Sequence, residues 1–148
     1  MRFLKKKILN NLKYLKMDIE SHIIYNGVIC NKCKEQIASR HRHDYVTCSC
    51  GESFVDGGLE GYIRRSPDAI PIVYFSSDPH EVIRHFAARG SRGKDNKQPL
   101  EWVSISKMSD EYLVAVLEYG GADWHLQIIA DEIAYRNENN IKIEEDEM

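Results

Sequence analysis

Residues 22–62 alternate short apolar runs with turn signals, a pattern that predicts small β-strands. Residues 23–25 and 28–29 flank Asn26 and Gly27, and this arrangement predicts a β-hairpin. The second part of the segment adds two more apolar runs and a glycine-rich turn, at residues 45–47, 53–55 and 56–58. The segment is therefore expected to form compact β-structure.

The pattern changes in the next part of the chain. Residues 70–75 form an apolar run that predicts one strand. Asp78 is placed to cap a helix that would end at Gly90, and Glu81 would complete a capping box. Residues 90–98 are polar and basic, so a loop is expected there.

The C-terminal third has the apolar spacing of two amphipathic helices. Ser109 is predicted to cap the first helix, Gly120 to end it, and Asp123 to cap the second. The inward-facing positions are Leu113, Val116, Leu117, Leu126, Ile129, Ala130 and Ile133. Because the link between the helices is so short, they should pack as an antiparallel hairpin.

Residues 1–16 are predicted to form a short basic amphipathic helix, with an apolar stripe and lysines on the other side. The helix could bind a membrane surface or nucleic acid, or it could pack on the body of the protein or on a partner. The alternative that Met17 is the natural start stays open.

Together these patterns predict an α+β fold, in which a small β-rich zinc ribbon precedes a mainly α-helical part with a helical hairpin. The expected divisions are the basic helix, the zinc-ribbon-like domain, the helical region and an acidic tail, at residues 1–16, 22–62, 70–138 and 139–148. No apolar stretch approaches the ~20 residues needed to cross a bilayer. With no secretory signal pattern, a cytoplasmic location is expected.

All four cysteines of the chain lie between residues 30 and 50, as Cys30 and Cys33 followed by Cys48 and Cys50. Two close pairs across a short connection are typical of a tetrahedral thiolate site. A reducing compartment favours metal thiolates over disulfides. The spacing therefore predicts one structural zinc ion bound by these four residues.

The second pair is tighter than usual, because a single residue separates Cys48 from Cys50. One ligand could instead be His41 or His43, which precede this pair. Both ligand sets stay open at the level of sequence.

The formal net charge of −3 is unevenly distributed. Residues 1–16 carry six basic side chains and no acidic one, so the rest of the chain is strongly acidic. An acidic body repels nucleic acid unless its basic residues cluster on one face. A protein partner is therefore expected before a nucleic acid, and the oligomeric state is left open.

Two basic segments are candidates for anion binding. They comprise Arg40, His41, Arg42 and His43, and, in the later loop, Arg89, Arg92 and Lys94. If the segments converged, the protein could be an enzyme or a sequestrant of a phosphorylated small molecule or nucleotide. In the simpler interpretation both are solvated loops. No catalytic residue is assigned.

Two stretches resemble known families. The pattern Cys30-x-x-Cys33, His41-Arg42-His43-Asp44, Cys48-x-Cys50-Gly51 and Val55-Asp56-Gly57-Gly58 resembles a zinc-ribbon-like family of unknown function from bacteria and phages. The segments 89–100, 108–111 and 132–136 resemble a module of uncharacterised tailed-phage proteins.

The resemblance implies a phage accessory protein that acts in the bacterial cytoplasm. Neither family supplies an activity. Because no nucleophile or general base is placed beside the segment Arg40 to His43 in the sequence, a non-enzymatic binding module is expected, with a host or phage protein as partner and nucleic acid second.

Overall fold

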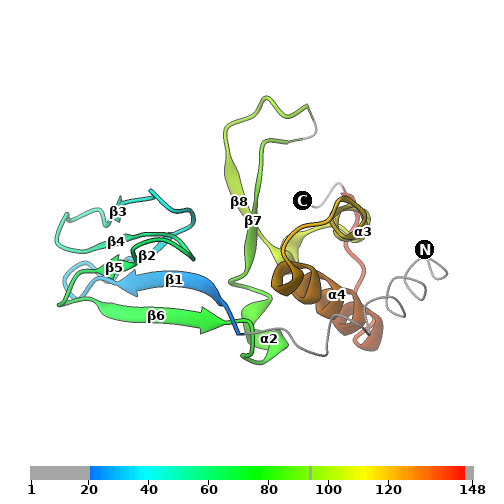
Figure 1. The fold of residues 1–148 in the computed structure, drawn as a ribbon, viewed down its shortest axis with the longest axis horizontal. Helices are drawn as coiled ribbons and strands as arrows, with labels where there is room; N and C mark the ends of the chain where they lie inside the picture. Colours follow the sequence, from blue (N-terminus) through cyan, green and yellow to red (C-terminus); the bar gives the residue numbers. More distant parts are fainter. Residues whose placement is uncertain (1–20, 94, 146–148) are drawn as a thin grey trace. The chain divides into compact units, whose positions relative to one another are not determined.

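The computed structural model describes residues 21–93 and 95–145. Contacts divide them into two compact units, one from His22 to Asp78 and one that begins at Pro79. Figure 1 shows small antiparallel sheets in the first unit and helices with a β-hairpin in the second. The predicted α+β class is thus confirmed.

Two three-stranded antiparallel sheets build the first unit. The first sheet has the order β2-β1-β6 and consists of β1 (Ile23–Ile29), β2 (Gln36–Ser39) and β6 (Ile70–Phe75). The second has the order β3-β4-β5 and consists of β3 (Val46–Thr47), β4 (Phe54–Asp56) and β5 (Arg64–Arg65). The predicted strand at residues 70–75 is β6, and its pairing with β1 places it in this unit.

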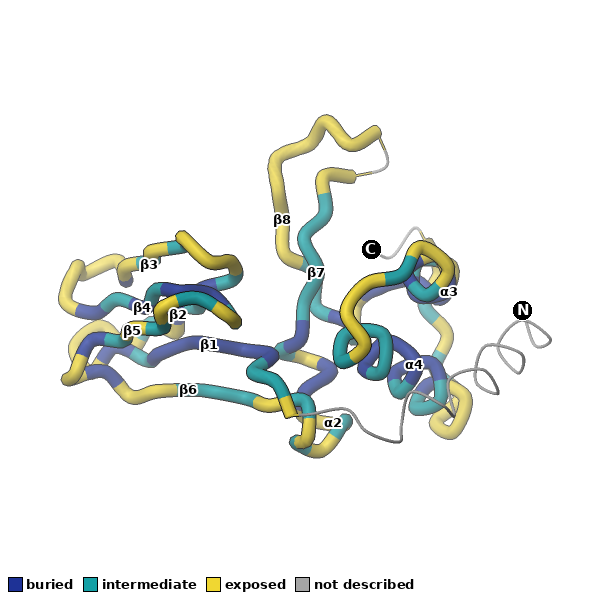
Figure 2. Tube along the Cα trace, in the orientation of Figure 1, coloured by how far each residue is buried: buried dark blue, intermediate teal, exposed yellow. Residues whose placement is uncertain are grey.

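The apolar core of the first unit is small and includes two cysteines. One cluster consists of Val28, Cys30, Ile37, Cys48, Val55 and Ala69, and Ile24 and Tyr25 are buried as well. Figure 2 shows that β1 is buried along most of its length. So small a core leaves a need for stabilisation from another source.

The hairpin predicted at Asn26 and Gly27 is wrong, because both residues lie inside the single strand β1. Gly27 pairs with Ala38 on one side and with Ile72 on the other. Pairing on both edges overrides the local turn preference of these two residues. The glycine serves packing instead, since the Tyr25 ring lies over it.

The second unit contains α2 (His80–Ile83), β7 (Ala88–Ser91), β8 (Glu101–Ser104), a 3₁₀ turn η1 (Ile105–Lys107), α3 (Asp110–Tyr119) and α4 (Asp123–Glu138). Strands β7 and β8 form an antiparallel hairpin, and α3 packs against α4 across a short link. The loop expected at residues 90–98 begins later, because Gly90 and Ser91 belong to β7; the described residues 92–93 and 95–100 connect the two strands.

The helix predicted from Asp78 to Gly90 is wrong beyond Ile83, where α2 ends. Asp78 does not cap it, because its carboxylate accepts the backbone N–H of Phe75 at 2.8 Å instead. Gly90 lies in β7 rather than at a helix end. The four-residue helix is too short to be stable alone, so pairing of the following residues with β8 decides the local structure.

Of the three helix ends predicted in the C-terminal third, those at Ser109 and Gly120 are confirmed, because Gly120 is the C-cap of α3. Ser109 caps α3 as predicted, and its hydroxyl accepts the backbone N–H of Tyr112 at 3.1 Å. The cap assigned to Asp123 is wrong, because α4 has Ala122 at that position and no side-chain cap. Asp123 lies in the first turn, where its charge still complements the helix dipole.

Residues that follow α4 form backbone hydrogen bonds with the rest of the second unit. The backbone N–H of Asp110 donates to the carbonyl of Ile143 at 3.0 Å, and the backbone N–H of Ile141 donates to the carbonyl of Arg136 at 2.9 Å.

The helix expected at residues 1–16, together with Lys94, lies outside the described residues. Across the described ranges, every helix is too short or too polar to cross a membrane.

Candidate metal centre

The four cysteines of the sequence meet at one point of the first unit. Their sulfur atoms all lie within 4.8 Å of one another. The Sγ of Cys50 lies 3.6 Å from that of Cys30 and 3.4 Å from that of Cys48. Thiolates bound tetrahedrally at ~2.3 Å would lie about 3.8 Å apart. The four cysteines are therefore close enough to hold a metal ion.

The first pair lies on a tight turn that follows β1. The backbone N–H of Lys34 donates to the carbonyl of Cys30 at 2.9 Å, and that of Cys33 approaches the Cys30 sulfur at 3.5 Å. Lys34 has a positive φ of 65°, which reverses the chain direction. The two-residue spacing thus turns both sulfurs toward one side.

The second pair lies on a matching turn between β3 and β4. The backbone N–H of Gly51 donates to the carbonyl of Cys48 at 3.0 Å, and that of Ser53 donates to the Cys48 sulfur at 3.3 Å. Gly51 has a φ of 78°, which a glycine adopts at little cost. The left-handed glycine directly after Cys50 is how the tight spacing is accommodated.

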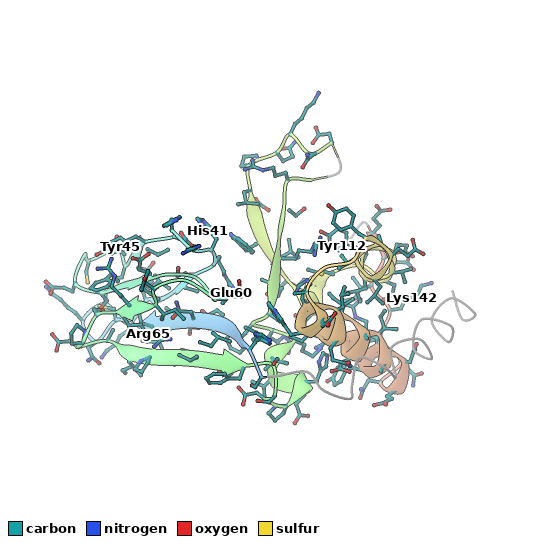
Figure 3. All side chains as sticks on the ribbon, in the orientation of Figure 1. His41, Tyr45, Glu60, Arg65, Tyr112 and Lys142 are labelled. Atoms are coloured by element: carbon teal, nitrogen blue, oxygen red, sulfur yellow. The ribbon has the colours of Figure 1, made fainter. Side chains whose placement is uncertain are left out.

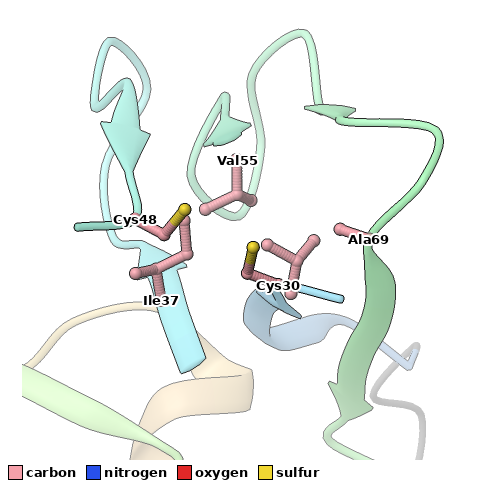
Figure 4. Close-up of a cluster of buried hydrophobic side chains, with 6 residues drawn as sticks. Cys30, Ile37, Cys48, Val55 and Ala69 are labelled. Atoms are coloured by element: carbon pink, nitrogen blue, oxygen red, sulfur yellow. The ribbon is translucent and has the colours of Figure 1, made fainter. Parts of the chain in front are cut away.

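The cluster is half inside the core and half at the surface. Cys30 and Cys48 are buried, whereas Cys33 and Cys50 are exposed. Figure 4 shows the two buried cysteines beside Ile37, Val55 and Ala69. A bound ion would therefore connect the apolar core to both turns.

The cysteine pKa values diverge strongly. Hydrogen bonds with the Ser53 side chain and the Cys33 backbone lower the pKa of Cys30 to about 6. At Cys50 the backbone of Glu52 favours the thiolate, but desolvation and the neighbouring cysteines outweigh it and raise the pKa to about 12. Crowded thiols cannot all ionise beside one another without a cation. Four soft sulfur donors at this spacing fit zinc.

A carboxylate joins the two turns. One oxygen of Glu35, which follows the first turn, accepts the backbone N–H of Ser49 at 2.6 Å and its hydroxyl at 2.7 Å. The two hydrogen bonds from Ser49 lower the pKa of Glu35. Ser49 is the single residue between Cys48 and Cys50, so this contact orients the second pair.

The basic segment Arg40 to His43 lies in the connection between β2 and β3, which joins the opposite ends of these strands from the cysteine turns. Asp44 accepts the backbone N–H of Arg40 at 2.7 Å, and its carbonyl accepts the Ser39 hydroxyl at 2.6 Å. The Arg40 guanidinium lies 5.0 Å from the centroid of the Tyr25 ring. His41, Arg42 and His43 are exposed, and the group of potential metal ligands consists of the four cysteines alone within the described chain.

The glycine motif after β4 packs on this loop. Gly58 has a φ of 58°, and a Cβ there would lie 2.4 Å from the carbonyl carbon of His41. Its backbone N–H donates to the Ser39 hydroxyl at 2.8 Å. The two motifs noted in the sequence, His41 to Asp44 and Val55 to Gly58, therefore support each other structurally.

A buried asparagine connects the two sheets, and sequence reasoning missed it. The Asn26 amide donates to the carbonyl of Gly58 at 2.8 Å, and its oxygen accepts from the Arg65 guanidinium at 2.9 Å. In the sequence Asn26 gives only a turn signal. Its function depends on partners more than thirty residues away.

The second basic segment belongs to the other compact unit. Arg89 on β7 lies 3.4 Å from the His125 ring nitrogen, and burial followed by this positive charge lowers the pKa of His125 to about 4. Arg92 is exposed, and Lys94 lies outside the described residues. Because the two basic segments belong to different units, their convergence stays a prediction.

The second unit holds a buried ion cluster that sequence reasoning also missed. Glu132 accepts two hydrogen bonds from Arg84, both at 2.8 Å, and one from Arg136 at 2.7 Å. His80 lies 2.9 Å from the same carboxylate, and Arg136 also pairs with Asp110 at 3.0 Å. The only sequence signal was the i,i+4 spacing of Glu132 and Arg136 on one helix.

These features define a β-rich domain with a four-cysteine cluster able to hold a metal ion, followed by a helical unit. Residues 22–67 match a family described as a domain of unknown function, DUF7695. Comparisons with curated proteins and with solved structures give no match. The predicted resemblance to a family of unknown function is confirmed for these residues. The zinc-ribbon link, the phage origin and the C-terminal module stay predictions.

Proposed function

We propose that residues 22–78 form a zinc-stabilised, non-enzymatic binding module. The observation that carries the proposal is the meeting of four sulfurs, from Cys30, Cys33, Cys48 and Cys50, within 4.8 Å. Four protein ligands complete a tetrahedral shell and leave no position for substrate or a reactive water. The zinc ion therefore has a structural role in this proposal.

A bound zinc ion would stabilise the fold of this unit. The buried apolar cluster around the cysteines comprises six residues, two of them cysteines themselves. The strands of the second sheet are two or three residues long. An ion bound to both turns would link strands that these contacts alone hold weakly.

Metal analysis of protein purified under reducing conditions tests this proposal. We expect one zinc per chain, and we expect a chelator to lower the unfolding temperature. A variant with Cys30→Ser and Cys48→Ser should retain no zinc. The control variant Thr47→Ser, which changes an exposed neighbour of Cys48, should retain one zinc per chain. Wild-type protein without metal, or with two disulfides under these conditions, would contradict the proposal.

We also propose that the protein is a phage-encoded accessory protein of the bacterial cytoplasm. The support is the resemblance of residues 28–62 and 86–143 to bacterial and phage proteins. The module would bind a macromolecule through its exposed surface. The acidic balance of the whole chain favours a protein partner.

A further inference from the structure

A cavity of about 690 Å³ lies in the second unit, between the β7–β8 hairpin and α3. Its walls come from the end of β7, the loop and first part of β8, the first half of α3 and the segment after α4. All of these segments belong to one compact unit. The volume lies within the range of small-molecule binding sites.

The hairpin and the helix both contribute apolar walls to this cavity. Pro99 and Val103 line the hairpin side. Tyr112 and Ala115 line the helix side, and their spacing of three residues places them on one side of α3. Figure 3 shows the Tyr112 side chain extending from α3 on the side of the hairpin. A ligand in this cavity would therefore bury apolar groups on both sides.

Three glutamates from three different segments add negative charge to the walls. Glu101 lies on β8, Glu111 in the first turn of α3, and Glu145 in the segment after α4. None of the described residues that line the cavity is basic. The lining therefore favours a cationic ligand and disfavours an anionic one.

Basic residues of the neighbouring segments lie outside this lining. Lys142 forms an ion pair with Glu144 at 2.9 Å, and its side chain is 72% exposed. Glu144 raises the pKa of Lys142 most, and Glu111 contributes less. Arg92 and Lys97 are exposed in the hairpin loop and do not line the cavity. The acidic groups of the described lining are thus not cancelled by basic groups within it.

The acidic groups are spread around the cavity instead of being gathered at one point. A metal site needs several ligand atoms close together, and in the described part of the chain the four cysteines form the one such group. Carboxylates on separate segments of an apolar cavity fit a ligand whose positive charges are separated by apolar groups. Aliphatic polyamines have this structure, because methylene chains connect their ammonium groups. An aromatic ring such as that of Tyr112 also attracts ammonium groups.

We propose that this cavity binds an aliphatic polyamine. Its ammonium groups pair with Glu101, Glu111 and Glu145 through charge-assisted hydrogen bonds. Its methylene groups contact the apolar walls. The inference goes beyond the proposed zinc module and does not rest on it, because every described lining residue belongs to the second unit.

Isothermal titration calorimetry of the full-length protein, purified under reducing conditions, tests the inference with spermidine as the probe. We expect saturable binding of one spermidine per chain, and the affinity should fall as salt rises. Hexamminecobalt(III) is the control ligand, since it carries three positive charges without methylene chains. It should bind at least tenfold more weakly than spermidine.

Variants at exposed positions identify the cavity. Glu101→Gln and Glu111→Gln should each weaken spermidine binding about tenfold, because one charge-assisted hydrogen bond is lost. Ala115→Lys should abolish binding, because its own ammonium group would occupy the cavity. The matched control is Glu118→Gln, which removes an exposed acid of α3 outside the lining and should leave binding unchanged.

Three results would each overturn the inference: no saturable binding of spermidine, equal affinity for hexamminecobalt(III), or equal losses in Glu111→Gln and Glu118→Gln. A lysine-rich peptide is titrated in parallel. If the peptide binds through Glu101 and spermidine does not, the cavity is a protein-docking site and the polyamine inference is wrong. Zinc content is measured on the same samples, so that failure of the zinc proposal is recognised separately.

Discussion

Ser49 donates both its backbone N–H and its hydroxyl to one carboxylate oxygen of Glu35, at 2.6 and 2.7 Å. Glu35 follows the first cysteine turn, and Ser49 lies within the second. The contact therefore joins the two halves of the candidate metal centre without contributing a ligand. Groups that orient metal ligands in this way commonly affect metal retention.

We predict that Glu35→Gln releases zinc about tenfold faster than wild type, while the folded protein still binds one equivalent. The amide oxygen can accept only neutral hydrogen bonds, which are weaker than those to a carboxylate. Transfer of zinc to a chromogenic chelator measures the rate. Glu60→Gln, an exposed change in the same unit, is the control, and equal rates for both variants would refute the role assigned to Glu35.

We predict that Gly27→Ala destabilises the first unit by roughly 1–3 kcal/mol. A Cβ at this position would lie 2.6 Å from Cε1 of Tyr25 and 2.7 Å from the carbonyl oxygen of Ile37. The carbonyl belongs to the paired strand and cannot move freely. Amide hydrogen exchange in β1 measures the effect, because opening of this strand exposes its backbone.

Gly90→Ala provides the contrast. Its nearest atom is Cδ1 of Leu100 at 3.0 Å, the end of a flexible side chain that can shift. We expect a change below about 1 kcal/mol in the second unit. Similar losses at both glycines would show that backbone crowding at Gly27 is not the cause.

The sequence identified the cysteine cluster because metal ligands carry their spacing in a short segment. It also predicted the Ser109 cap and the strand β6 from local chemistry. The hairpin at Gly27 failed because pairing with two distant strands decides that conformation. The prediction of a long helix after Asp78 was also wrong because of strand pairing. Strand β7 pairs with β8, which begins ten residues after β7 ends.

Contacts between buried polar groups were the least predictable part. The partners of Asn26 and the Arg84 partner of Glu132 are far away in the sequence, so the sequence around Asn26 or Glu132 does not reveal these contacts. Periodicity reports which face of a helix is buried. It does not report which charged residue that face will pair with.

We predict that Glu132→Gln destabilises the second unit by roughly 3–5 kcal/mol. The change removes the carboxylate that neutralises the buried Arg84 guanidinium, whereas Arg136 retains its ion pair with Asp110. Both tryptophans of the chain, Trp102 and Trp124, belong to this unit, so their fluorescence reports its unfolding. Glu138→Gln, on the exposed end of the same helix, should change the free energy of unfolding by less than about 0.5 kcal/mol.

The same carboxylate predicts a pH dependence. Burial alone would raise the pKa of Glu132, but hydrogen bonds from Arg84, His80 and Arg136 outweigh it and lower the pKa from 4.5 to about 2. A group whose pKa is lower in the folded state stabilises the protein above its unfolded pKa and loses that effect as the pH falls. The stability of the second unit should therefore decline between about pH 4.5 and pH 2.

Tryptophan-monitored urea unfolding at several pH values measures this decline in stability, and the decline should be shallower in Glu132→Gln. A variant that follows the wild-type pH curve would show that other acids, such as Asp110 beside Arg136, cause the acid sensitivity.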